Sequence, residues 1–212
     1  MTEIVWTRVS REHALNVMRV VSSDENAAVF SEDLTEVTSR DLPFYDKLRH
    51  YRLINYATLP CFTADYVGDV ENDTFIALDG LANTIYDAND SDKLRLDTHN
   101  IVDYLDFFLD QVRGPDGDIY LIKSPDDLPM LGSLPENQRQ MVITHHRSVK
   151  VQDIGDDMGF DVRGTLFYGG SLISARVHVT PTGKLSIHDQ ELLLQGIHFP
   201  MSPVEHRYVS EG

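Results

Sequence analysis

Asp161, His178 and Ser186 are residue types that together could do nucleophilic chemistry. The segments on either side of Gly169-Gly170 alternate polar and apolar residues, which predicts a β-hairpin with a two-residue turn. The predicted register places Asp161 opposite His178, and His178 opposite Ser186 on a third strand. Because an acid, an imidazole and a hydroxyl then share one row, a small hydrolase is one functional hypothesis.

The same row is also typical of the wet face of a half-buried antiparallel sheet. A hydroxyl on a regular strand has no free backbone amide beside it, so the row carries no oxyanion hole. Arg163, Arg176 and Lys184 lie on the same polar face, which leaves room for a small anionic ligand. A small hydrolase or a small-ligand-binding protein using this face is therefore the alternative function.

Asp103, Asp106 and Asp110 form the second candidate site. They share one side of a segment whose apolar residues follow helical spacing. These apolar residues are Ile101, Tyr104, Leu105, Phe108 and Val112. We therefore expect an amphipathic helix, capped by Asp97 or Thr98 and stopped by Gly114-Pro115, whose three aspartates face water.

The acidic residues are concentrated around this helix. Residues 65–118 contain 14 carboxylates and three basic residues, so they account for −11 of the net charge of −16. Such a field steers cationic partners toward the surface. The preferred function is a non-enzymatic interaction or regulatory module that binds a basic protein partner, so an enzyme is the less favoured class. The plainer interpretation is that aspartates fill turns and keep the protein in solution.

Composition excludes several other functions. With 34 acidic and 18 basic residues in 212, and no basic patch, the chain lacks the footprint of a nucleic-acid binder. Cys61, the single cysteine, excludes an internal disulfide and a cysteine-rich zinc module. No apolar run reaches the length of a membrane helix and no leader is apparent, so we expect a cytoplasmic protein without membrane contact.

The motifs for cofactors and metals are incomplete. Glycine-rich phosphate loops are absent, so no cofactor is predicted. The run Asp87 to Asp92 resembles the start of a calcium loop but has neither the glycine nor the glutamate that such a loop needs. His178, His188 and Asp189 could share a metal, yet surface histidines on a wet strand explain them as well, and no metal site is predicted.

The elements that would position these residues predict an α+β fold. It has antiparallel sheets in both halves, one long central amphipathic helix packed on the first sheet, and a C-terminal three-stranded meander. A helix is also expected after Ser10, and a meander of strands at residues 50–56, 61–67, 74–78 and 83–87.

We expect an N-terminal subdomain at residues 1–123, a connecting segment at 124–146 and a C-terminal subdomain at 147–212, with one continuous domain as the alternative. A short helix is expected after Ser124, and the conformations of residues 130–146 and 191–203 are left open.

Overall fold

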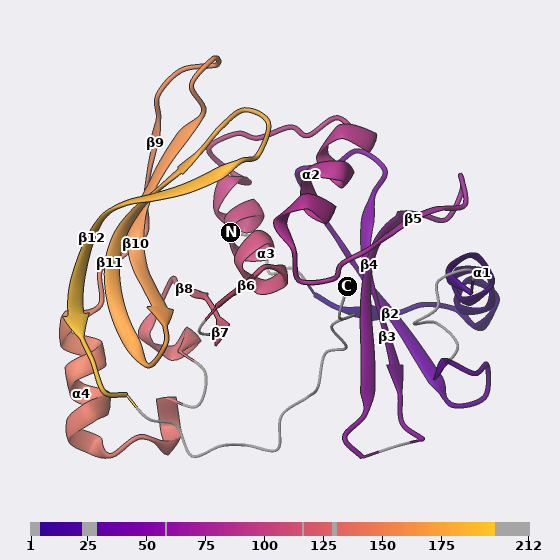
Figure 1. Ribbon diagram of the computed structural model, residues 1–212, viewed down its shortest axis with the longest axis horizontal. Coiled ribbons are helices and arrows are strands. Elements are labelled where there is room, and N and C mark those ends of the chain that lie inside the picture. The colour runs from indigo at the N-terminus through magenta and orange to yellow at the C-terminus, as the bar shows by residue number, and fades with distance from the viewer. Residues whose placement is uncertain (1–4, 23–28, 58, 116, 129–130, 198–212) are drawn as a thin grey trace. The chain divides into compact units, whose positions relative to one another are not determined.

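The computed structural model describes residues 5–22, 29–57, 59–115, 117–128 and 131–197 (Figure 1). Contacts divide these residues into two compact units, of which the first ends at Arg95 and the second begins at Leu96. Each unit contains an antiparallel sheet and helices, so the α+β class is confirmed. The division into 1–123, 124–146 and 147–212 stays a prediction about folding domains.

The first unit is built on a five-stranded antiparallel meander. Its strands follow chain order, as β1 (Thr7–Arg8), β2 (Thr35–Asp41), β3 (Arg49–Asn55), β4 (Phe62–Asp69) and β5 (Thr74–Ala77). The predicted strands at 50–56, 61–67 and 74–78 are confirmed to within two residues at each end.

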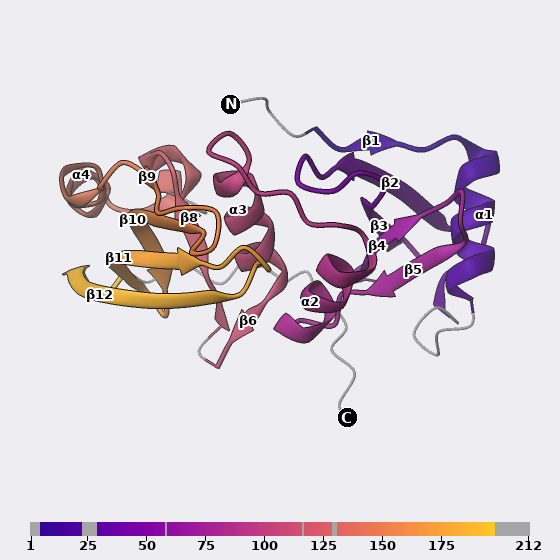
Figure 2. The same cartoon turned by 90° about the horizontal axis from the view of Figure 1, so that it is seen from above.

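Helix α1 (Arg11–Val21) covers one face of this sheet (Figures 1 and 2). The Ser10 hydroxyl accepts a hydrogen bond from the backbone N–H of His13, which confirms the expected cap. Val17, Met18 and Val21 recur on one side of the helix and pack on the core of the sheet.

Helix α2 (Ala82–Ser91) replaces the strand predicted at 83–87, and that prediction is wrong. Thr84, Ile85 and Tyr86 favour a strand by their residue types. The helix instead buries Ile85 together with Ala88 and Asn89, which lie one turn further along the same face. Burial of that face outweighs the local β preference.

The second unit contains a sheet in the order β12-β11-β10-β8, with β9 also paired to β10 (Figures 1 and 2). Its strands are β8 (Tyr120–Ile122), β9 (Lys150–Asp153), β10 (Phe160–Tyr168), β11 (Ser171–Val179) and β12 (Leu185–Leu194). Two short strands, β6 (Arg113–Gly114) and β7 (Gly117–Asp118), form a separate ladder.

The predicted hairpin register is confirmed. Leu166 lies opposite Ile173 across the Gly169-Gly170 turn. On the next strand, Leu185 lies opposite Val179. The leucines at 192–194, whose conformation the sequence left open, continue β12 beyond an irregularity in its pairing with β11.

Helix α3 (Ile101–Gln111) is the predicted amphipathic helix, but one long central helix is not confirmed. It is as short as α1, and it ends at Gln111, before the expected stop at Gly114. Its N-cap residue is Asn100 rather than Asp97 or Thr98. We expected it on the first sheet, whereas it belongs to the second unit and contacts β8 there.

The segment expected to connect two halves contains helices of its own. A 3-10 helix, η2 (Pro125–Asp127), begins at the Ser124 capping box, and η3 (Leu131–Ser133) and α4 (Glu136–His145) follow. Val142 of α4 packs in a cluster with Phe167 and Leu172 of the hairpin. This part of the chain is therefore built into the second unit.

Candidate functional site

The polar row on the C-terminal sheet has the predicted register but different contacts. Asp161 lies opposite His178, and the His178 Nδ1 and Asp161 Oδ1 atoms are 3.0 Å apart. Ser186 lies opposite His178 on β12, yet its hydroxyl is hydrogen-bonded to Nε2 of His188 at 2.8 Å. The structure thus brings the acid and the imidazole together and pairs the serine with a second histidine.

Arg176 makes this row part of an ion-pair network. Its guanidinium donates to Asp161 at 3.2 Å and to Asp189 at 2.8 Å. Burial raises the pKa of Asp161, but the hydrogen bonds from His178 and Arg176 outweigh it and lower the pKa overall. The hydrogen bond from Arg176 also lowers the pKa of Asp189. Both carboxylates are therefore held in the charged form.

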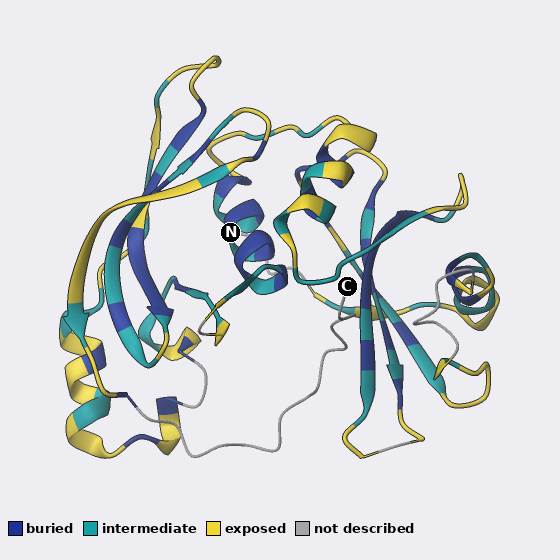
Figure 3. Cartoon of the chain, in the orientation of Figure 1, coloured by how far each residue is buried: buried dark blue, intermediate teal, exposed yellow. Residues whose placement is uncertain are grey.

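The three aspartates of α3 face water only in part. Asp103, Asp106 and Asp110 are each half-buried, and the Asp106 carboxylate accepts a hydrogen bond from Lys123 Nζ at 2.8 Å. Burial raises the pKa of Asp103. The three aspartates are half-buried because α3 is covered on most sides. Phe107 and Leu109 are buried along with the expected apolar stripe (Figure 3).

Several exposed carboxylates of the acidic stretch lie in the first unit. Glu71, in the turn between β4 and β5, and Asp87 and Asp90 of α2 are exposed. None of the three makes an ion pair with another residue that the structure describes. The assignment of Asp103, Asp106 and Asp110 as partner-binding residues stays a prediction.

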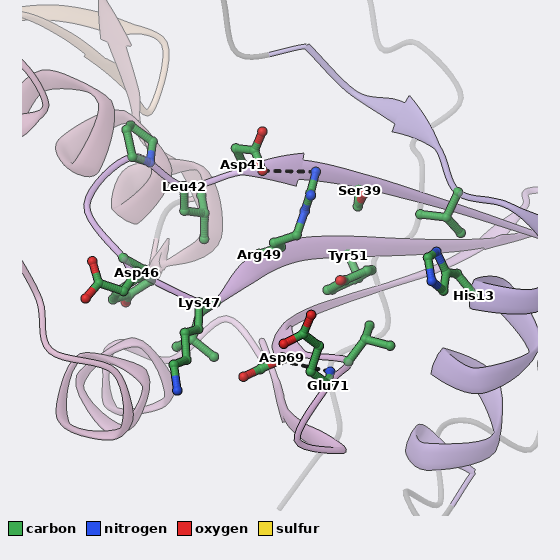
Figure 4. A pocket seen from close by; sticks show the side chains of 15 residues that line it. His13, Ser39, Asp41, Leu42, Asp46, Lys47, Arg49, Tyr51, Asp69 and Glu71 are labelled. Carbon is green, nitrogen blue, oxygen red and sulfur yellow. Dashed lines mark hydrogen bonds and ion pairs between the residues drawn. The ribbon is translucent and has the colours of Figure 1, made fainter.

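A pocket of about 600 Å³ opens in the first unit, and the sequence analysis did not find it. Figure 4 shows Ser39 and Tyr51 of the sheet, His13 of α1 and Glu71 around the same space. Its volume lies in the range of about 300–1,000 Å³ that is usual for ligand sites. Chain segments that are distant in sequence line it, so no local motif marks it.

The hydroxyl groups of two buried residues face this pocket. Ser39 and Tyr51 are cross-strand neighbours on β2 and β3, and each side chain is at most 5% exposed. Neither hydroxyl is hydrogen-bonded to a residue in the described part of the chain. Burial raises the pKa of Tyr51, with Asp69 and Asp41 adding to the shift and Arg49 opposing it. The phenol therefore stays protonated and can both donate and accept.

Carboxylates outnumber cations around the pocket. Its lining has four carboxylates against Lys47 and Arg49. These four are Asp41, Asp46, Asp69 and Glu71. Arg49 is held by Asp41 at 3.0 Å, and Asp46 is paired with Arg95.

Asp69 is the buried carboxylate of this set. Its side chain accepts hydrogen bonds from the backbone N–H of Glu71 and from the amide of Asn72, which are neutral donors. Asp69 and Glu71 make no ion pair within the described residues, so the negative charge of this wall is not balanced by a neighbouring cation.

The opposite face of the same sheet holds a buried charged network around His50. The Arg40 Nε–H donates to His50 Nδ1 at 2.9 Å, and His50 Nε2 lies 2.9 Å from Asp65 Oδ1. Because Nδ1 accepts, the imidazole proton is on Nε2 and is donated to Asp65. Arg52 donates to the same carboxylate, and the guanidinium groups of both arginines lie within 5 Å of the Trp6 ring centroid.

Both ring nitrogens of His50 are hydrogen-bonded within this network. Burial is the largest influence on His50 and lowers its pKa, although Asp65 opposes the shift. Burial would raise the pKa of Asp65, but His50 and Arg52 together lower it well below its usual range. We interpret this network as a structural device rather than as a site.

No group of three or more His, Cys, Asp or Glu residues within the described ranges is placed to hold a metal ion. None of the helices in these ranges is both long and apolar enough to cross a membrane.

The chain matches no protein-family model, and searches of curated proteins and of solved structures return no match.

Proposed function

We propose that this protein is a non-enzymatic binding module for a basic protein partner and that it acts through the acidic surface of its first unit. The observation that carries the proposal is the exposure of Glu71, Asp87 and Asp90, which lack ion-pair partners among the described residues. An exposed carboxylate without a cation is free to attract one from a partner and to speed association.

The half-buried aspartates of α3 support the proposal less well. Asp106 is already held by Lys123, so a partner would have to compete with an internal ion pair. The proposal therefore moves the binding surface from Asp103, Asp106 and Asp110 to the first unit. Cytoplasmic localisation and the absence of nucleic-acid binding stay predictions from composition.

The test uses a defined basic peptide, a fluorescein-labelled nonapeptide with three arginines separated by Gly-Ser pairs. Its binding should weaken as salt rises from about 50 mM to about 300 mM, because exposed charges are screened over shorter distances. A double Asp87→Lys, Asp90→Lys variant should bind roughly three- to tenfold more weakly, since each exposed ion pair contributes little. Fluorescence anisotropy measures both effects.

The matched control is the double variant Asp156→Lys, Asp157→Lys. These two aspartates are also exposed and adjacent in space, but they lie between β9 and β10 in the second unit. The control changes the net charge by the same amount, so it should bind the peptide nearly as well as the unchanged protein. Binding that ignores salt and both double variants would contradict the proposal.

A further inference from the structure

The pocket of the first unit contains hydrogen-bonding capacity that the described residues do not use. Ser39 and Tyr51 are buried residues that line the pocket, and their hydroxyls open into it with no hydrogen-bond partner in the described ranges (Figure 4). Two adjacent hydroxyls without a protein partner that open into one cavity offer hydrogen-bonding positions to the donor atoms of a ligand.

The charge of the pocket indicates the sign of that ligand. Arg49 forms an ion pair with Asp41, although its Nε has no hydrogen-bond partner, whereas Asp69 and Glu71 make no ion pair within the described structure. A buried carboxylate such as Asp69 is costly to leave without a positive partner. A cationic group placed between this wall and the two hydroxyls would satisfy all four acceptors.

The remaining walls indicate the shape of the ligand. Val9, Leu42, Leu48 and Val70 also line the pocket and offer apolar contact. Long basic side chains pack their methylene stems on apolar surface while the charged end finds polar partners. The pocket therefore suits an apolar stem that ends in a cation.

We propose that this pocket binds the guanidinium group of an arginine side chain presented by the basic partner, a step that rests on the proposed function. A guanidinium has five N–H donors and no acceptor, in a planar fork that suits carboxylates. The ammonium group of lysine has three donors and matches this set of acceptors less fully. The pocket thus selects arginine over lysine.

The experiment compares the arginine nonapeptide with its lysine counterpart, using the intact protein. Tyr51→Phe removes one hydroxyl and keeps the ring that packs against Phe75. Glu71→Gln removes one exposed charge and keeps the side-chain size. Each variant should weaken binding of the arginine peptide about three- to tenfold, because each loses one hydrogen bond or charge contact to a cation. The lysine peptide should lose less.

Two control variants make the same tyrosine-to-phenylalanine and glutamate-to-glutamine changes at residues outside the pocket. Tyr56→Phe alters an exposed tyrosine beyond the end of β3, and Glu191→Gln alters an exposed glutamate of β12. Neither residue lines the pocket, so both controls should bind the arginine peptide as the unchanged protein does.

The outcomes separate this inference from the proposed function. Weaker arginine binding in Tyr51→Phe and Glu71→Gln, with unchanged controls, supports the pocket. If these two variants bind normally while Asp87→Lys with Asp90→Lys binds weakly, the pocket assignment is overturned and the acidic surface stands. If salt and all of these variants leave binding unchanged, the proposed function fails as well.

Discussion

At the scale of single residues, the first unit separates a buried charged network from two hydroxyls that open into the pocket. His50 is fully buried between Arg40 and Asp65, whereas Ser39 and Tyr51 face a cavity on the other side of the same sheet. The strand alternation separates the two groups, because successive residues of a strand point to opposite faces.

The neutral state of His50 predicts a pH dependence of stability. Burial holds the pKa of His50 below 6.5, so the unfolded chain takes up a proton in a range where the folded chain does not. The contribution of neutral His50 to the free energy of unfolding is fully present above about pH 6.5. It is lost as the pH falls below that value, by at most about 1.4 kcal/mol per pH unit. Asp65, whose pKa is also lowered, adds a further loss only below its ordinary value near 3.9.

His50→Gln isolates this contribution. Glutamine supplies an N–H donor for Asp65 and a carbonyl acceptor for Arg40 but does not titrate. The free energy of unfolding, measured with urea between pH 7 and 5, should therefore fall less steeply than in the unchanged protein. His99→Gln, at an exposed position, is the control and should keep the original slope. An equally steep fall in His50→Gln would show that another group is responsible.

At the scale of elements, a buried hydrogen bond links α3 to the turn between β11 and β12. The Tyr104 hydroxyl donates to the backbone carbonyl of Gly183, in the turn between β11 and β12, at 2.8 Å. Tyr104 is fully buried. The bond therefore joins the helix to the far end of the C-terminal meander without exposure to water.

Tyr104→Phe tests this link. The change leaves the Gly183 carbonyl without its buried donor, so the free energy of unfolding should fall by about 1–3 kcal/mol. Tyr56→Phe, at an exposed tyrosine, should change it little. Urea denaturation followed by circular dichroism measures both. A Tyr104→Phe protein as stable as the control variant would mean that the bond adds nothing.

Elements governed by local rules were predictable from sequence, and elements decided by packing were not. The Gly169-Gly170 hairpin follows from strand alternation and turn type, and its register is confirmed residue by residue. The Ser10 cap is likewise a local signal. The residue types of α2 favour β structure, whereas its helical form depends on a face that becomes buried in the folded chain.

In the candidate site, too, the local pattern was predictable from sequence and the contacts made by folding were not. Sequence alternation put Asp161 beside His178, but it could not show that Ser186 turns to His188. The pocket was missed because its lining joins β2, β3, α1 and the turn after β4, which only the folded chain brings together. Ester hydrolysis measured before and after Ser186→Ala tests the hydrolase hypothesis, which predicts an activity that this change removes.

At the scale of the whole molecule, the net charge of −16 is the property from which the functional account starts. The structure shows how far the carboxylates that carry this charge are exposed. It half-buries the aspartates of α3 and exposes Glu71, Asp87 and Asp90 in the first unit. The account therefore predicts that a basic partner contacts the first unit and that an arginine side chain enters its pocket.

The most direct measurement is an NMR titration of the 15N-labelled protein with the arginine nonapeptide. The account predicts saturable shifts of the backbone amides of Ser39, Tyr51 and Glu71, reduced in Tyr51→Phe and diminished by salt. Shifts confined to the surroundings of Asp103, Asp106 and Asp110, or no saturable shifts at all, would contradict it.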